Sequence, residues 1–205
     1  MNFPSSVIKN AVEAIANFPG IGKKTALRLV IYLLRNKKIA YNIAESIKKL
    51  VNETTYCENC YNISKSKLCD ICLDPKRDKF TICVVEDIRD IIAIENTMQY
   101  KGYYHVIGGL ISPIDGIGPT DLNINSLIDK INNTNIKEII FALCASIEGE
   151  TTSYYIYKKI KNNLTLEITT ISKGISIGGE LEYTDQITLG RALVNRYSFE
   201  NTLKK

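Results

Sequence analysis

Cys57-Glu58-Asn59-Cys60 and Cys69-Asp70-Ile71-Cys72 are two matched Cys-x-x-Cys pairs separated by a polar loop of eight residues. Zinc prefers four soft ligands in a tetrahedron, and each pair offers two thiolates. Four protein ligands leave no open position, so the pattern predicts a closed, structural zinc site formed by Cys57, Cys60, Cys69 and Cys72. Two disulfides or a redox dithiol are the alternatives. Disulfides fit poorly because the N-terminus shows no secretory signal, and redox chemistry would need only one pair.

The rest of the composition is that of a globular protein. The chain has 205 residues, of which 45% are hydrophobic, enough to form one large domain or two or three small ones. No apolar run approaches a membrane span, so we expect no membrane partner and a reducing cytoplasm as the compartment. Cys83 and Cys144, outside the pairs, lie in apolar runs and are expected in the core.

The charge is distributed unevenly along the chain. Residues 1–53 hold nine basic and three acidic residues, a net charge of +6, whereas residues 54–79 carry +1 and residues 80–205 carry −3. A basic head before a mildly acidic body favours a polyanion as the ligand of the head. Solvated helix faces are the alternative interpretation of these charges.

Two helices joined by a glycine hairpin are expected in this basic head. Ser5 or Ser6 can cap a first helix whose apolar residues recur at helical spacing, and Pro19 ends it. Gly20 and Gly22 then allow a tight hairpin, and a second helix begins at once. A third apolar pattern runs from about residue 40 to residue 51.

The hairpin resembles the helix-hairpin-helix DNA-binding motif. Its glycines leave backbone N–H groups uncovered at a helix N-terminus, which attracts phosphate, and basic side chains on the first turns add cationic contacts. Nothing here reads base edges, so we expect binding to double- and single-stranded DNA without sequence preference. An ordinary helical turn is the alternative. The predicted DNA-binding residues are Gly20, Gly22, Lys23, Lys24 and Arg28.

Strands and helices alternate after the cysteine pairs. Buried strands are expected at residues 81–85, 103–107, 138–144 and 166–171, with helices in the intervals, which predicts a parallel sheet covered by helices on both faces. Functional groups of such sheets lie beyond the carboxyl ends of the strands. Glu86 and the pair Glu148 and Glu150 occupy those positions.

This placement of acids resembles a Toprim domain, a Rossmann-like fold whose acids hold Mg²⁺ for phosphoryl transfer. Glu148-Gly149-Glu150 replaces the usual Asp-x-Asp, which counts against metal catalysis. Asp90, one turn after Glu86, extends the acidic rim. Capping of helix N-termini is the alternative role for these acids. His105 is the only histidine and lies in an apolar strand, so we expect a packed core residue there.

The ordered set of motifs resembles the RecR family of bacterial recombination mediators over essentially the full length. The strings that carry the resemblance include Phe18-Pro19-Gly20-Ile21-Gly22, the cysteine spacing, Cys83-Val84-Val85-Glu86, Gly116-Ile117-Gly118-Pro119, Glu148-Gly149-Glu150 and Gly178-Gly179-Glu180-Leu181-Glu182-Tyr183. The chain departs from the family at Cys144-Ala145-Ser146, where Asn-Pro-Thr is common, and at Lys173 and Ser176.

The resemblance implies a DNA clamp without catalytic activity. Such a protein works with RecO, and in some settings RecF, to load recombinase onto single-stranded DNA. It implies that Lys24 and Arg28 contact DNA and that Glu86, Asp90, Glu148 and Glu150 bind a protein partner. A Mg²⁺-dependent Toprim nuclease or primase-like enzyme is the competing hypothesis, although 205 residues leave no room for the further modules of primases.

We therefore expect a multidomain α/β protein. The expected parts are a helix-hairpin-helix domain at 1–53, a four-cysteine zinc finger at 54–79, a Toprim domain at 80–172, and a turn-rich tail with one helix at 173–205. Surplus apolar residues on the helices of the head and in the tail offer two separate self-complementary surfaces. Two such contacts per chain can close a tetrameric ring. DNA binding would place the protein at the nucleoid.

Overall fold

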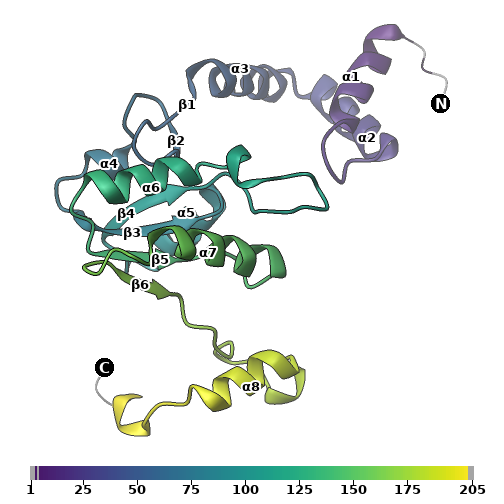
Figure 1. Ribbon diagram of the computed structural model, residues 1–205. Coiled ribbons are helices and arrows are strands. Elements are labelled where there is room, and N and C mark those ends of the chain that lie inside the picture. The colour runs from purple at the N-terminus through teal and green to yellow at the C-terminus, as the bar shows by residue number, and fades with distance from the viewer. Residues whose placement is uncertain (1–2, 4, 203–205) are drawn as a thin grey trace. The chain divides into compact units, whose positions relative to one another are not determined.

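The computed structural model describes residue 3 and residues 5–202 (Figure 1). The chain forms two compact units, Met1–Thr55 and Tyr56–Lys205, which are described separately below. No helix in the described part of the chain combines the length and the apolar character needed to cross a membrane.

The first unit consists of three helices, α1 (Ser6–Ala16), α2 (Lys23–Arg35) and α3 (Lys37–Glu53). Ser5 caps α1 by accepting a hydrogen bond from the Val7 N–H at 3.2 Å, as one of the two serines was expected to do. Its core is small: Val12, Ala26 and Val30 are buried between α1 and α2. No residue of α3 is buried within this unit.

The cysteine-containing segment begins the second unit. It comprises two short strands that pair with each other, β1 (Thr55–Tyr56) and β2 (Ile63–Ser64), and the one-turn helix α4 (Asp70–Leu73). The N–H of Glu58 donates to the carbonyl of Lys67 at 2.8 Å, which turns the loop between the pairs back on itself. The polar loop therefore folds as its length predicted.

A four-stranded sheet follows, built from β3 (Asp78–Val85), β4 (Gly102–Val106), β5 (Glu138–Phe141) and β6 (Glu167–Thr170). The strand order is β4-β3-β5-β6 and every neighbouring pair is parallel. The predicted parallel sheet is confirmed. β5 ends three residues earlier than expected, so Cys144 lies beyond the strand and is exposed. The prediction of Cys144 as a core residue was wrong, whereas Cys83 is buried as expected.

Three helices cover the sheet: α5 (Ile88–Asn96) on one face, and α6 (Ile124–Asn133) and α7 (Ile147–Ile160) on the other (Figure 1). Alternate residues of β3 point to opposite faces, so Ile82 and Val84 pack with α6 and α7, while Cys83 and Val85 pack with α5. β3 is an inner strand and all four residues of its second half are buried, which explains its continuous apolar run.

The tail contains little regular structure. A 3-10 turn at Leu181–Tyr183 precedes α8 (Gln186–Val194), which Asp185 caps by accepting a hydrogen bond from the Thr188 N–H at 2.9 Å. A further 3-10 turn spans Phe199–Thr202, and another, Pro119–Asp121, lies between β4 and α6. No residue of α8 is buried. The tail thus presents apolar side chains that its own unit leaves uncovered.

Candidate metal centre and nucleic-acid interface

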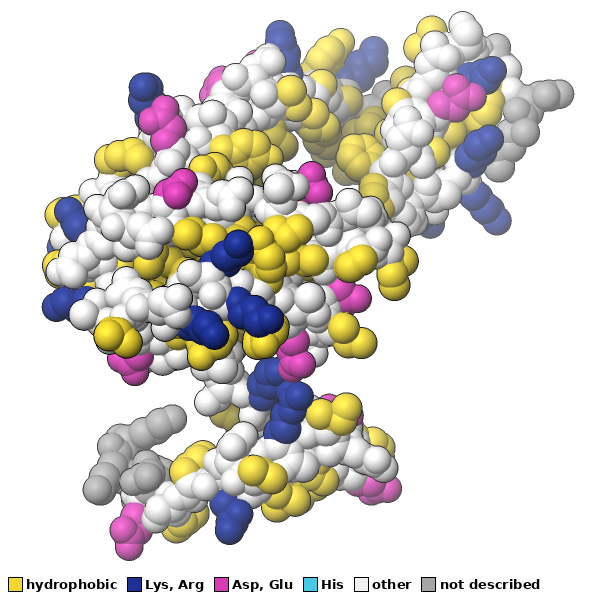
Figure 2. Space-filling view, in the orientation of Figure 1, with side chains coloured by type: hydrophobic (Ala, Val, Ile, Leu, Met, Phe, Trp, Pro, Cys, Tyr) yellow, Lys and Arg dark blue, Asp and Glu magenta, His cyan; other side chains and the backbone are white. Residues whose placement is uncertain are grey.

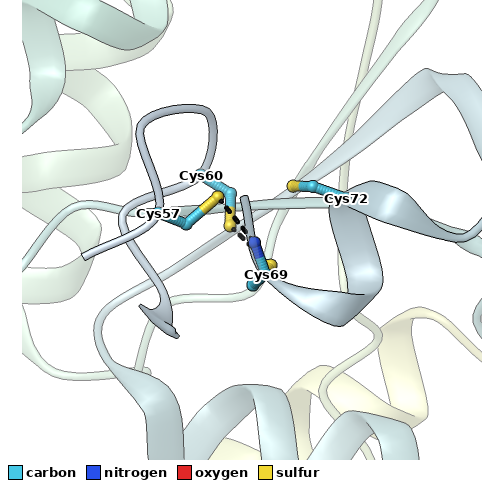
Figure 3. Close-up of side chains that lie close together, drawn as sticks. All are labelled: Cys57, Cys60, Cys69 and Cys72. Atoms are coloured by element: carbon cyan, nitrogen blue, oxygen red, sulfur yellow. Dashed lines mark hydrogen bonds between the residues drawn. The ribbon is translucent and has the colours of Figure 1, made fainter. Parts of the chain in front are cut away.

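The four paired cysteines come together at one point (Figure 3). Their sulfur atoms all lie within 4.8 Å of one another. Cys57 and Cys60 come from the first loop, Cys69 directly precedes α4 and Cys72 lies within it. Cys57, Cys60 and Cys69 are at most 4% exposed, and Cys72 is half-buried. This convergence of four thiols is the donor set of a closed zinc site, so the residues fit the predicted metal.

Hydrogen bonds to sulfur orient the cysteine side chains. The backbone N–H of Cys69 donates to Cys57 Sγ at 3.3 Å, and Asn59 Nδ2 donates to Cys72 Sγ at 3.3 Å. Cys60 Sγ and Cys69 Sγ are 3.5 Å apart. N–H donors to sulfur are typical of thiolate ligands, because they stabilise the negative charge that metal binding requires.

Electrostatics explain why these thiols need a cation. The shared hydrogen bond is the largest cause that raises the pKa of Cys60 and the largest cause that lowers the pKa of Cys69. One thiolate thus forms at the expense of its neighbour. Four ionised sulfurs within 4.8 Å would repel one another strongly unless a positive ion lay among them. The cluster is therefore suited to a divalent, sulfur-preferring metal.

The hairpin of the first unit has the geometry expected of a phosphate site. Gly20 adopts a φ of 77°, which favours glycine, and the Ile21 N–H donates to the Phe18 carbonyl at 3.0 Å. Gly22 is the N-cap of α2 and has no side chain to cap it. A Cβ built on Gly22 meets no heavy atom within 4 Å. The N–H groups of the first turn of α2 are thus open to an external acceptor.

Basic side chains surround this open helix terminus. Lys23, Lys24 and Arg28 are all exposed, and no acidic residue lies in the first turn of α2. The five predicted DNA-binding residues therefore lie in the hairpin and in the first two turns of α2. Helix dipole, free N–H groups and positive side chains act there in the same direction and favour an anion.

The predicted partner-binding acids have different local roles. Glu86 follows β3 and is half-buried; burial, and then the nearby Asp90 and Asp87, raise the pKa of Glu86. Asp90 Oδ2 accepts hydrogen bonds from the N–H groups of Glu86 at 3.0 Å and Asp87 at 3.1 Å. Asp90 therefore supports the N-terminus of α5, which is the capping role that the sequence offered as an alternative. Its partner-binding role stays a prediction.

The second acidic pair lies at the start of α7. Glu150 Oε1 is 2.5 Å from Lys173 Nζ and 3.3 Å from Arg191 Nη1, and these two cations of the tail lower the pKa of Glu150. A hydrogen bond from its own backbone, and then one with Ser146, lower the pKa of Glu148. Among the residues that the structure describes, the four cysteines form a group close enough to hold a metal ion. The predicted partner-binding acids form no such group.

Sequence reasoning missed several residues of these sites. Lys173 and Arg191 lie 18 positions apart and far along the chain from Glu150, and only the folded tail brings them to it. Lys130, on α6, donates to the carbonyl oxygen of Asn59 between the first two cysteines. His105 is fully buried, as predicted, and burial lowers the pKa of His105 to about 4.

Three family models match the chain in the order of its parts. They are the RecR helix-hairpin-helix over residues 8–51, the Toprim domain over residues 81–172, and the RecR C-terminal region over residues 174–197. The matched ranges include the hairpin of the first unit, the parallel sheet and α8.

Several relatives that match along nearly their full length carry the name recombination protein RecR. Recombination protein RecR of Flavobacterium johnsoniae is 52% identical over 205 residues, which span 100% of this chain and 99% of that protein. Recombination protein RecR of Cytophaga hutchinsonii is 52% identical over 202 residues, 98% of each chain. That of Bacteroides thetaiotaomicron is 48% identical over 202 residues, again 98% of each chain.

Proposed function

Because the chain belongs to the recombination protein RecR family, we propose that it acts in recombinational DNA repair as a DNA-binding mediator that catalyses no reaction itself. It binds double- and single-stranded DNA through the head and a protein partner through the Toprim domain. With RecO, and in some settings RecF, it loads recombinase onto single-stranded DNA. It works in the cytoplasm, at the nucleoid, and holds one structural Zn²⁺ on Cys57, Cys60, Cys69 and Cys72.

The open N-terminus of α2 is the observation that supports DNA binding. Free N–H groups, three exposed cations and the absence of acid from the first turn recognise phosphate and read no base edge. The expected affinity is therefore electrostatic and salt-dependent, and it is the same for every sequence.

Fluorescence anisotropy with labelled oligonucleotides across a salt series tests this interface. Lys24→Ala combined with Arg28→Ala should weaken binding to all sequences alike. The slope of log K against log salt should flatten by roughly 0.7–0.9 for each phosphate that the variant no longer neutralises. Lys48→Ala with Lys49→Ala removes the same charge from α3 and is the matched control. Equal losses in both double variants would mean that net charge alone, and not the hairpin, determines binding.

The Toprim acids are proposed to serve a partner and not a reaction. Glu86 directly follows β3 and Glu148 lies in the first turn of α7, the helix after β5, so their carboxylates repel DNA phosphate and suit a basic protein surface. Glu86→Gln with Glu148→Gln should abolish binding to purified RecO and leave DNA affinity intact. Asp90 is unsuitable for this test because its loss would also weaken the start of α5.

An incubation with labelled DNA and Mg²⁺ or Mn²⁺ tests the competing enzymatic hypothesis. The mediator function predicts intact DNA. Metal-dependent cleavage that disappears in the same Glu86 and Glu148 variant would instead assign a nuclease.

The proposed working form is a tetrameric ring that encloses DNA. Two groups of exposed apolar side chains lie on different units of the chain, one on α3 and one on the tail (Figure 2). Ile43 and Ile47 of α3 are 44% and 49% exposed, and Ile187 and Val194 of α8 are 69% and 77% exposed. Covering both by further copies of the chain gives two distinct contacts, as a closed ring requires. A ring adds a topological hold to weak phosphate contacts.

A further inference from the structure

The cysteine segment is attached to the Toprim sheet through one small group of residues. β4 is an edge strand of the sheet, and the N–H of Val106, the β4 residue in register with Val85 of β3, donates to the carbonyl of Cys60 at 2.8 Å. The ring of Tyr61 packs edge-on against His105 with centroids 5.4 Å apart. The cysteine segment thus covers part of an exposed sheet edge.

Lys130 reaches this junction from α6. Its Nζ donates to the carbonyl oxygen of Asn59, inside the first Cys-x-x-Cys turn, and lies 3.4 Å from His105 Nδ1. His105 Nε2 is 2.8 Å from the carbonyl oxygen of Asn123, which can only accept. Nε2 therefore carries the ring proton and Nδ1 is a free acceptor. Both atoms that face the ammonium are acceptors, as a positively charged Lys130 needs.

In the described part of the chain, no carboxylate forms an ion pair with the Lys130 ammonium. Among the ion pairs of residue 3 and residues 5–202, none involves Lys130. Asn59 lies between Cys57 and Cys60, so the hydrogen bond from Lys130 Nζ to its carbonyl oxygen places the ammonium beside the first Cys-x-x-Cys turn. Burial lowers the pKa of Lys130, and the nearby Cys60, Cys72 and Cys57 act in the opposite direction. The cysteine cluster is therefore the acidic group that this cation faces. A half-buried lysine without a carboxylate partner is costly unless such a charge is present.

We propose that Lys130 is the charge partner of the metal site: its ammonium offsets the negative charge of the four-thiolate centre and holds the first Cys-x-x-Cys turn against α6. The inference rests on the proposed zinc site. Four thiolates exceed the charge of one Zn²⁺ by two, so a cation held beside them stabilises the metal-bound form. Lys130 thereby couples metal binding to the Toprim domain.

The test measures zinc affinity of the full chain by competition with a chromophoric chelator. Lys130→Met should weaken zinc binding by about tenfold or more, as removal of outer-shell groups does at other metal sites. Lys130→Arg keeps the charge and should retain nearly the wild-type affinity. Lys161→Met, an exposed lysine at the end of α7, is the matched control and should change nothing. Undiminished affinity in Lys130→Met would overturn the proposal.

A second variant separates charge from packing. Cys72→His replaces one thiolate by a neutral imidazole, a ligand that zinc also accepts, and so removes one negative charge from the centre. Lys130→Met should then cost less zinc affinity in the Cys72→His background than in the wild type. Equal costs in both backgrounds would assign Lys130 a packing role and overturn the proposal.

Two further outcomes are distinguishable. If circular dichroism shows that Lys130→Met does not fold, Lys130→Gln takes its place, since it keeps a donor for the Asn59 carbonyl without the charge. Wild-type affinity in Lys130→Gln overturns the proposal. A wild-type protein that binds no zinc contradicts the metal site itself, whereas a zinc-binding wild type with an indifferent Lys130 contradicts only the role of that lysine.

Discussion

Gly149 lies in the first turn of α7, between the two acids of Glu148-Gly149-Glu150, and the chain leaving β5 passes very close to it. A Cβ at this position would lie 2.0 Å from the carbonyl oxygen of Cys144 and 3.0 Å from its carbonyl carbon. Because both atoms belong to the backbone, a side chain can be accommodated only if the loop or the helix moves. The glycine therefore allows the close approach that brings the acids to the carboxyl end of β5.

We predict that Gly149→Ala destabilises the protein by about 1–3 kcal/mol, the usual cost of overpacking. Urea unfolding, followed by circular dichroism, measures the change. Gly190→Ala in α8 is the matched control, because a Cβ there meets no atom within 4 Å and alanine favours a helix by about 1 kcal/mol over glycine. If Gly149→Ala is as stable as Gly190→Ala, the loop that contains Cys144 can move away from the added methyl group without a measurable loss of stability.

The ion pair of Arg77 and Glu95 predicts that the folding stability of the protein depends on pH. Arg77 Nη1 donates to Glu95 Oε1 at 2.9 Å, the Tyr104 hydroxyl donates to the same oxygen at 2.6 Å, and Arg77 Nη2 donates to Glu95 Oε2. The hydrogen bonds of Arg77 are the largest cause that lowers the pKa of Glu95. A depressed pKa stabilises the folded chain above the pKa of the unfolded glutamate, about 4.3, and this contribution is lost as the pH falls through the lower, folded value.

Glu95→Gln should therefore lower the urea midpoint at pH 7, and the difference from wild type should shrink as the pH falls below about 4.3. Glu182→Gln removes an exposed carboxylate of the tail and should leave the midpoint unchanged at both pH values. If the difference in urea midpoint between Glu95→Gln and wild type stays constant from pH 7 to pH 3, Glu95 stabilises the protein through its shape and not through its negative charge.

At the scale of elements, α3 has an apolar face that its own unit does not bury. It is amphipathic, yet none of its residues is buried within the first unit. Leu27 of α2, in contrast, packs partly buried against the core of the head. A charge at Leu27 would therefore disrupt the head itself, so the proposed contact between copies is better tested on α3.

If the proposed tetramer forms, Ile43→Asp with Ile47→Asp should break its head contact and reduce the assembly from four copies to two, held together by the tails. Light scattering of the full chain at micromolar concentration measures the mass. Asn42→Asp with Ser46→Asp places the same two charges one position away on the same exposed helix and should preserve the tetramer. An unchanged mass in the isoleucine variant would show that α3 is covered by something other than a second copy.

At the scale of the whole molecule, the two units should respond differently to loss of metal. The cysteine cluster belongs to the second unit, where Cys60 and Tyr61 contact the β4 edge, whereas the first unit has its own core of Val12, Ala26 and Val30. Metal binding at such sites is folding free energy for the segment that holds them.

We expect zinc removal by a chelator, or Cys60→Ser, to increase amide hydrogen exchange in residues 55–73 and at the β4 edge, while α1 and α2 keep their protection. Hydrogen exchange followed by mass spectrometry measures both units in one sample. Cys144→Ser, which changes a cysteine outside the cluster, is the control and should have no such effect. Equal loss of protection in α1 and α2 would show that the metal stabilises the whole chain.

The sequence by itself determined the features that depend on local spacing. Two Cys-x-x-Cys turns across a short loop favour convergence of the four thiols. Pro19 followed by glycines favours the end of one helix and the start of another, and buried strands that alternate with helices favour a parallel sheet. Those patterns predicted the cysteine cluster, the open α2 terminus and the sheet, and each is present. Their order along the chain also indicated the family.

Only the tertiary structure decided which distant side chains meet. Lys130 reaches Asn59 across 71 positions of the chain, and Arg191 reaches Glu150 across 41, because sheet order and helix packing bring them together. The end of β5 was also decided there: the pairing of β5 with β3 and β6 stops at Phe141, so Cys144 lies beyond the strand and its thiol is exposed. Such contacts depend on how elements pack in three dimensions, and no periodicity along the sequence encodes that packing.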